Sequence, residues 1–269
     1  MSNQVDPASV QLLARLNHTE FLRELARWSG DTGAIEERDG VLLYACGTGF
    51  PVTLNGVVRL DPTAAPERVF DLADSWFGAL GRGYTLSTRV GADAPDDLLE
   101  AAAVQRGLVL LGDSPVMVCR HTPRAVPPPA GIDLRWVDDG SSIADAVAVS
   151  DAAYQSLGMP AGIILEATTS LERMQAPHLH TVIAYEDDVP LATAMVLSSH
   201  GIAGVYYVGT VESARRRGLA DAVTRAVTIR GLELGARFVC LQATAMGEPV
   251  YRRMGYEEIE RYHGMVRLV

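Results

Sequence analysis

The hydrophobic pattern of this chain changes its period at Gly218, and that change limits the possible folds more than any other feature. The stretch before it, "AGVYYVGT", is rich in β-branched and aromatic residues, which favour a strand. Residues 219–227 then repeat apolar side chains at helical spacing, and Gly235 marks a helix end. The next stretch, "RFVCLQA", is apolar on both faces, as a buried strand is. This order of strand, helix and strand predicts a layered α/β or α+β fold.

The neighbouring segments extend this prediction over the second half of the chain. The stretch "IDLRWV" has strand composition. The stretches "LHTVIAYED" and "VPLATAMVLSS" also have it, and together with "AGVYYVGT" they predict an antiparallel meander. Helices are expected at residues 143–154, capped by Ser141 or Ser142, and at residues 165–174. A short helix at "EPVYRRM" is expected to precede a last strand region in "GYEEIERYHGMVRL".

The length of 269 residues favours two domains. The one low-complexity segment is "HTPRAVPPPAGID", whose clustered prolines favour an extended connector. We therefore predict an N-terminal domain at residues 1–122, a proline-rich linker at residues 123–131 and a C-terminal domain at residues 132–269.

The charge and cysteine content indicate which partners and which compartment to expect. The formal net charge of -10 opposes binding to nucleic acid or anionic lipid and suits a cationic substrate. The three cysteines, Cys46, Cys119 and Cys240, lack disulfide or zinc-type spacing, which favours a reducing compartment. The first residues do not resemble a signal peptide, and the uncharged run at residues 189–211 is broken by Pro and Gly rather than suited to a membrane. A cytoplasmic protein, as a monomer or homodimer, is expected.

Three consecutive arginines stand in "ARRRGLA", at the start of the predicted helix. The first amides of a helix have no intrahelical partner and carry the positive end of its dipole, so they can bind an anion. Gly218 and Ala220 leave room for a phosphate to approach the backbone. The pattern predicts a pyrophosphate site, whereas the alternative is a solvated arginine cluster that binds nothing.

Residues 204–256 resemble the GNAT superfamily of acyl-CoA-dependent N-acyltransferases. The family motif [QR]-x-x-G-x-[GA] is matched from Arg215 to Ala220, and the second signature is matched by "LQATAMGEPVYRRMGY". The resemblance covers about residues 132–268 and implies a mixed, mostly antiparallel central sheet flanked by helices. Glu212 departs from the family pattern, because many members have proline there.

The resemblance also implies a reaction and its residues. Acetyl-CoA would be the acyl-donor substrate, without a metal, and a primary amine of a small molecule or peptide would attack it directly. Tyr251 would be the general acid that protonates the departing thiolate. The strand "YYVGT" would splay from its neighbour, so that its backbone could hold the pantetheine arm and the acyl carbonyl. The binding residues implied are Val208, Thr210, Arg215, Arg216, Arg217, Gly218, Leu219 and Ala220.

The general base stays open, because Gly204 stands where some GNAT enzymes have glutamate. The candidate bases are Glu166, Glu212, His200 and Asp151. The missing carboxylate also favours a rival function, a catalytically silent CoA-binding or scaffolding protein. Nucleic-acid binding rests on the three arginines alone, and the histidines at 178 and 180 lack a third ligand for a metal.

The first half of the chain weakly repeats the second. "GYTLSTR" corresponds to "ARFVCLQ", and Gly107 and Met117 correspond to Gly255 and Met265, although two α/β units could share this order by chance. A tandem protein is therefore predicted, with a degenerate GNAT-like N-terminal domain that covers the acceptor side. Pro66 falls in the place of Gly218 and removes an amide donor, so this half should not bind CoA.

Overall fold

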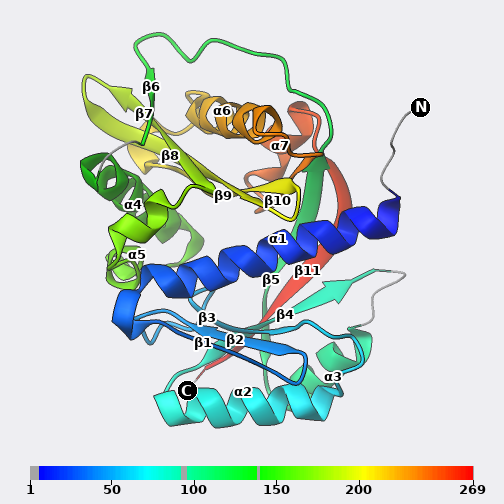
Figure 1. Cartoon of the computed structure of the whole chain (residues 1–269). Helices are drawn as coiled ribbons and strands as arrows, with labels where there is room; N and C mark the ends of the chain where they lie inside the picture. The colour runs from blue at the N-terminus through cyan, green and yellow to red at the C-terminus, as the bar shows by residue number, and fades with distance from the viewer. Residues whose placement is uncertain (1–5, 92–95, 138–139, 269) are drawn as a thin grey trace. The chain divides into compact units, whose positions relative to one another are not determined.

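The computed structural model describes residues 6–91, 96–137 and 140–268, and they form two compact units (Figure 1). Unit 1 contains the described residues up to Phe21, Val116–Leu165 and Ser170–Ile259. Unit 2 contains Leu22–Pro115, Glu166–Thr169 and the described chain from Glu260. The two units are thus interleaved along the sequence, unlike the linear ranges suggested by the proline-rich segment.

The sheet of unit 1 confirms the predicted meander. The four strands from β6 (Asp133–Trp136) to β9 (Ile202–Thr210) pair antiparallel in chain order. Strand β9 pairs parallel with β10 (Val239–Gln242), and β10 pairs antiparallel with the second half of β5 (Val109–Cys119). A parallel pair requires a crossover connection, and the amphipathic helix after Gly218 supplies it. The strands, in spatial order, are β6 (Asp133–Trp136), β7 (Leu179–Glu186), β8 (Val189–Ser199), β9 (Ile202–Thr210), β10 (Val239–Gln242) and β5 (Val109–Cys119).

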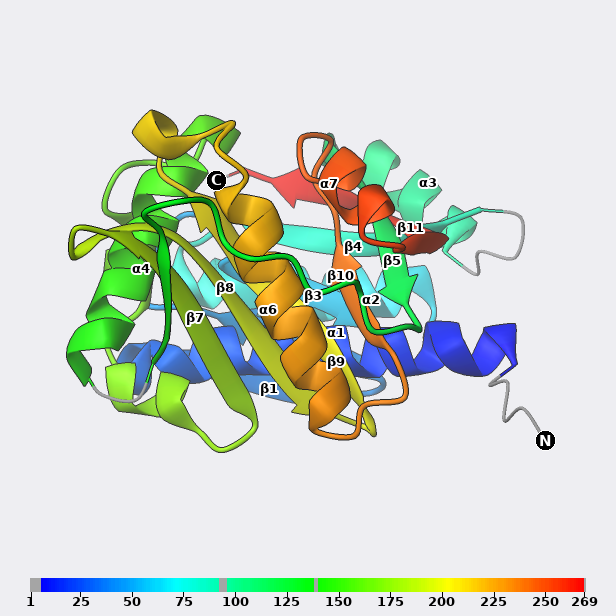
Figure 2. The same ribbon diagram turned by 90° about the horizontal axis from the view of Figure 1, so that it is seen from above.

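Helices cover both faces of this sheet. Helix α6 (Leu219–Glu233) lies across β8 and β9, as Figure 2 shows, and approaches closely because a Cβ at Gly231 would lie 2.8 Å from the Cβ of Ala203. Side chains alternate along a strand, so Gly204 faces the opposite side. That side carries α4 (Gly140–Tyr154) and the part of α1 (Pro7–Trp28) that ends at Phe21.

The core of unit 1 follows from the helical spacing of apolar residues in α6. Leu219, Val223 and Val227 are each at most 1% exposed and pack against Val205 and Leu241. Helix α7 (Glu248–Arg253) adds Tyr251 to the same cluster. The predicted helices at these two places are confirmed.

The helix expected at residues 165–174 is wrong. The chain forms two short pieces instead, α5 (Ile163–Ala167) and the 3-10 helix η3 (Leu171–Gln175). Between them, the amide of Thr169 donates to the carbonyl of Trp28 at 2.9 Å rather than to a helix carbonyl. The β-branched pair Thr168-Thr169 has low helix propensity, so the break costs little. The helix expected at residues 143–154 begins earlier, at Gly140, so Ser141 and Ser142 lie within it and not at its cap position.

Unit 2 has its own sheet and its own core. The pair β3–β4 is parallel, and the other neighbours are antiparallel. Phe70, Phe77, Leu86 and Leu99 form much of the core, each at most 1% exposed. The strands, in spatial order, are β1 (Ala34–Arg38), β2 (Val41–Ala45), β3 (Asn55–Arg59), β4 (Tyr84–Val90) and β11 (Glu257–Arg267), and the helices are α2 (Pro66–Leu80) and α3 (Asp97–Gln105).

Each unit is completed by a strand from the opposite half of the sequence. In unit 1, Met117 of β5 pairs with Leu241 of β10, and in unit 2, Met265 of β11 pairs with Leu86 of β4. The two methionines that correspond in the sequence repeat are buried in these two cores. The last strands of the two repeats are therefore exchanged. Among the described helices, none combines the length and hydropathy that a membrane span requires.

Candidate acyl-CoA site

Strands β9 and β10 separate shortly after they pair. Their parallel ladder joins Ala203 to Val239 and Gly204 to Cys240, and β9 then continues to Thr210 beside β8. The two strands are thus neighbours at one end and diverge at the other, within unit 1. Backbone groups of β9 that face this gap cannot bond to β10, so they are available to an extended ligand.

A β-bulge lies in the part of β9 that has left β10. Thr193 of β8 is opposite Gly209, whereas Met195 is opposite Tyr206, so β9 has one more residue than β8 between these pairs. Tyr207 has a φ of 53°, in the left-handed region that a bulky residue rarely adopts. A bulge leaves an extra residue outside the ladder and redirects its backbone groups. Val208, one of the predicted binding residues, lies in this bulge, and Thr210 ends the strand.

The predicted phosphate loop leads directly into α6. Gly218 is the residue before the helix and has a φ of 84°, and Arg216 has a φ of 63°. The amides of Leu219 and Ala220 lie in the first turn, where no helix carbonyl can accept from them. Leu219 is 1% exposed and packs into the core, so only its backbone can meet a ligand. The loop and the first turn of a 15-residue helix together form a cluster of backbone donors.

The three arginines of the loop make different contacts. Arg215 donates to Ser156 Oγ at 2.7 Å and to the carbonyl of Ala153 at 3.2 Å, which ties the loop to the end of α4. Arg217 forms a bidentate ion pair with Glu186 of β7. Arg216 is exposed, and no ion pair or hydrogen bond of its side chain is found among the described residues. Two arginines therefore hold the loop, and the third has an uncompensated positive charge.

Tyr251 lies on α7 and is 8% exposed. It packs in the same cluster as Leu219 at the start of α6 and Ala243, the residue after β10. Burial raises the pKa of Tyr251 to about 12, so its hydroxyl stays protonated at neutral pH. A Cβ at Gly247 would lie 2.8 Å from the Tyr251 ring and 3.1 Å from its hydroxyl, so the glycine makes room for this side chain.

Solved structures of several other proteins share the fold of this chain. A GCN5-related N-acetyltransferase from Kribbella flavida matches with a TM-score of 0.67 over 94% of each chain, at 21% identity. One from Sphaerobacter thermophilus matches with a TM-score of 0.63, at 18% identity, over 93% of this chain and 85% of that one. A tandem GNAT protein from the clavulanic acid biosynthesis pathway matches with a TM-score of 0.61, at 13% identity, over 98% of this chain and 97% of that one.

The chain has the fold of the GCN5-related N-acetyltransferases. No protein-family profile and no curated protein sequence matches it. In this chain, β9 and β10 are the strands that separate, and α6 follows the loop that was predicted to bind phosphate. The mixed, mostly antiparallel architecture expected from the sequence is confirmed, as is the tandem form of the fold.

A buried asparagine occupies the space next to Gly204, where some members of this fold have glutamate. A Cβ at Gly204 would lie 1.9 Å from Oδ1 of Asn17, which α1 contributes. Asn17 is 0% exposed, donates to the Leu197 carbonyl at 3.1 Å and to Ser199 Oγ at 2.8 Å, and accepts from the Tyr206 hydroxyl at 2.8 Å. Position 204 must therefore be glycine.

Sequence reasoning missed this contribution of α1. One signal was available: Asn17 falls on the apolar stripe formed by Val10, Ala14 and Phe21, which are spaced at helical intervals. A polar residue on a buried stripe needs partners within the fold. The sequence does not say which strands supply them.

The candidate bases of the sequence lie in varied surroundings. Asp151 accepts from the amides of Gly162 at 2.8 Å and Ile164 at 3.0 Å, so both of its oxygens support the turn before α5. Glu212 and His200 are exposed, and Glu166 belongs to unit 2.

Among the residues described, no cluster of three or more metal-ligating side chains is present. A pocket of about 310 Å³ near His180, Met174 and Thr181 is lined by none of the predicted site residues.

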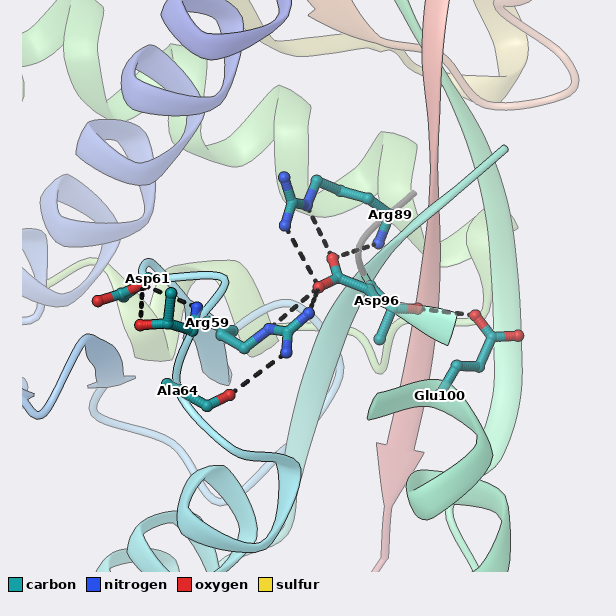
Figure 3. A network of polar contacts seen from close by, with 8 residues as sticks. Arg59, Asp61, Ala64, Arg89, Asp96 and Glu100 are labelled. Atoms are coloured by element: carbon teal, nitrogen blue, oxygen red, sulfur yellow. Dashed lines mark hydrogen bonds and ion pairs between the residues drawn. The ribbon is translucent and has the colours of Figure 1, made fainter. Parts of the chain in front are cut away.

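Unit 2 has a charged cluster at the corresponding place (Figure 3). Its parallel ladder ends with Val58 of β3 opposite Ser87 of β4. Arg59 follows in β3, and its guanidinium pairs with Asp96, which also accepts from Arg89 at 2.8 Å. The side chains of Arg59 and Asp96 are each 4% exposed. In unit 2, the residues beyond the parallel ladder of β3 and β4 thus belong to a buried cluster of ion pairs.

The start of α2 also differs from the start of α6. Ala65 precedes the helix with φ −61° and ψ 142°, and Pro66 is the first helical residue. Ala65 therefore stands where Gly218 stands in unit 1, and Pro66 corresponds to Leu219, one position from the sequence alignment of the two halves. Proline still removes one amide of the first turn, as expected.

Proposed function

We propose that unit 1 transfers an acetyl group from acetyl-CoA to a primary amine. The observation that carries this proposal is the splay of β9 from β10 beside the donor cluster that starts α6. An extended thioester substrate needs backbone donors and acceptors along its arm and positive charge at its phosphates. The acetyltransferase fold of the chain supports the same reaction class.

In this proposal, each site residue has a separate role in binding or in catalysis. Amides from Arg216 to Ala220 bind the pyrophosphate, and the exposed guanidinium of Arg216 adds charge. Backbone groups of Val208 and Thr210 hold the pantetheine arm and the acyl carbonyl. The amine attacks the carbonyl carbon, the C–S bond breaks, and Tyr251 donates its proton to the departing thiolate. The acidic net charge favours a cationic acceptor during encounter.

Acetyl-CoA binding is tested by thermal unfolding. A ligand at a hundredfold excess over its Kd stabilises the folded state by about 2.7 kcal/mol. For a chain of this size that corresponds to a Tm increase of about 5–10 °C. Arg216→Glu should weaken binding about 10- to 100-fold, because one charged hydrogen bond of about 1.5–3 kcal/mol is lost. Arg38→Glu, the same charge reversal at an exposed residue of β1, is the control.

If acetyl-CoA gives no shift with the wild type, or the same shift with Arg216→Glu, the assignment of this loop is contradicted.

A second function, a CoA-binding protein without turnover, is favoured by the absence of a carboxylate at position 204. Thiol release from acetyl-CoA across a panel of primary amines separates the two. Tight binding without thiol release on any amine would support the silent protein.

A further inference from the structure

The amine needs a proton acceptor, and β9 cannot provide one at position 204. Asn17 Oδ1 occupies that space. Asn17 itself is an amide without basic character, and both ends of its side chain hold other groups. Any base on this face of the sheet must therefore come from another residue of an element packed there.

His18 is the next residue of α1 and reaches both strands where they part. The last parallel pair is Gly204 with Cys240, and Tyr206 and Gln242 follow two residues later on the same face. The His18 ring centroid lies 6.2 Å from that of Tyr206, and the His18 side chain is hydrogen bonded to Gln242. His18 thus spans the beginning of the gap, on the face opposite α6.

The environment of His18 keeps it neutral. Burial lowers its pKa to about 4, although the hydrogen bond with Gln242 acts in the opposite direction. A neutral imidazole that donates from one nitrogen carries a lone pair on the other. This nitrogen is therefore unprotonated at pH 7, and it can take the N–H proton that becomes acidic as the amine nitrogen bonds to the acyl carbon.

Gln242 adds an independent indication that a polar ligand belongs here. Its Nε2 is buried, and no partner for it is found among the described residues. A buried donor without a partner costs about 1–3 kcal/mol. A substrate oxygen placed between β9 and β10 would satisfy this donor and recover that cost.

We propose that His18 accepts the proton of the acceptor amine, which rests on the acetyl transfer proposed above. As the N–C bond forms, the amine N–H proton passes to the imidazole lone pair. The C–S bond breaks, and the sulfur takes the proton of the Tyr251 hydroxyl. The products are the amide and CoA thiol, and the imidazolium and phenolate return to their initial states by proton exchange with water.

The test measures thiol release from acetyl-CoA with a panel of primary amines, together with the acetyl-CoA thermal shift. His18→Gln keeps a polar side chain and removes the basic nitrogen. It should lower kcat about 10²- to 10⁴-fold, the usual contribution of a general base, with an unchanged acetyl-CoA shift. Imidazole added to His18→Ala should restore part of the rate. His121→Gln, at an exposed histidine just after β5, should behave as wild type.

The outcomes separate the two proposals. An active wild type with an equally active His18→Gln overturns the role of His18 and leaves acetyl transfer standing. A folded but slow His18→Ala that imidazole does not rescue also overturns it, because that result indicates a structural role. A wild type that binds acetyl-CoA and acetylates no amine overturns acetyl transfer, and the role of His18 falls with it.

Discussion

At the scale of single residues, burial sets the protonation of the groups that would move protons. Tyr251 and His18 are affected in opposite senses: burial raises the pKa of the phenol to about 12 and lowers that of the imidazole to about 4. Both shifts favour the neutral form, because desolvation penalises charge. A neutral phenol is a proton donor and a neutral imidazole is a proton acceptor. The two residues are therefore in the states that amine acetylation requires.

Tyr251 allows a prediction about pH. A phenol loses its proton only as the pH rises to its pKa, which burial raises to about 12. The kcat of the wild type should therefore show no alkaline decrease from Tyr251 between about pH 6 and pH 10. Tyr251→Phe should lower kcat about 10²-fold or more at every pH in this range, because the thiolate then leaves without an acid. A pH–rate profile measured with saturating acetyl-CoA checks both statements.

An alkaline limb near pH 8 that disappears in Tyr251→Phe would contradict this prediction. The acetyl-CoA thermal shift of the variant is the control, since loss of one hydroxyl should leave the binding loop unchanged.

At the scale of elements, both units contain a pair of parallel strands, but different side chains follow the parallel ladder in each unit. After the parallel ladder of β9 and β10, unit 1 has Tyr206 and Gln242. After the ladder of β3 and β4, unit 2 has Arg59 and the carboxylate of Asp96 (Figure 3). A cluster of buried charges holds its members together strongly, because separating them leaves a charge without a partner. We infer that this cluster, with Pro66, keeps unit 2 from binding CoA.

The Asp96 cluster predicts a stability effect in unit 2. Burial raises the pKa of Asp96, but hydrogen bonds from Arg89 and Arg59 outweigh it, so the pKa lies below 3.8. The carboxylate therefore contributes stability above about pH 4, and the contribution is lost as the pH falls through the lower folded-state value. Asp96→Asn should cost about 3–5 kcal/mol near pH 7, because two guanidinium groups then lose their counter-charge.

Urea unfolding at several pH values measures this effect. The difference between wild type and Asp96→Asn should shrink as the pH falls below about 4. Asp133→Asn is a suitable control, because that carboxylate is exposed and pairs with Arg135 at the surface. Equal urea midpoints of wild type and Asp96→Asn at pH 7 would refute the proposed cost.

At the scale of the whole molecule, neither half of the sequence contains all the parts of one unit. Unit 1 needs Asn17 of α1 and the part of β5 from Val116 to Cys119, and both come from the first half. In β5 the residues before Pro115 are largely exposed, whereas Val116–Cys119 is buried against β10. A fragment cut at the proline-rich segment therefore does not contain one complete compact unit.

We predict that residues 123–269 alone will not unfold cooperatively. This fragment lacks the strand next to β10 and the helix beside Gly204, so apolar and polar groups of the core lose their partners. Expression together with residues 1–122 should restore cooperative unfolding and acetyl-CoA binding, measured by thermal melts. A full chain cut by a protease at a site inserted in the proline-rich segment is the control and should remain folded. A stable, acetyl-CoA-binding fragment 123–269 would contradict the prediction.

The local elements were accessible from sequence because their signals are local. The helical spacing after Gly218 predicted α6, and the apolar run "RFVCLQA" predicted β10. Gly218, predicted to stand at the start of this helix, is the residue directly before α6. The prediction of one helix at residues 165–174 was wrong, because the amide of Thr169 donates to the distant carbonyl of Trp28 instead of to a helix carbonyl.

By itself the sequence determined where most strands and helices of the second half lie and which of their faces are apolar, and it predicted a loop whose backbone amides could bind an anion. Only the tertiary structure decided that β5 and β11 exchange partners, and that Asn17 and His18 stand beside the gap between β9 and β10. The physical reason is that periodicity reports how deeply a side chain is buried but not against what. A strand hydrogen bonds through its backbone, which is nearly the same in every strand, so the choice among distant partners is made by the packing of the whole core.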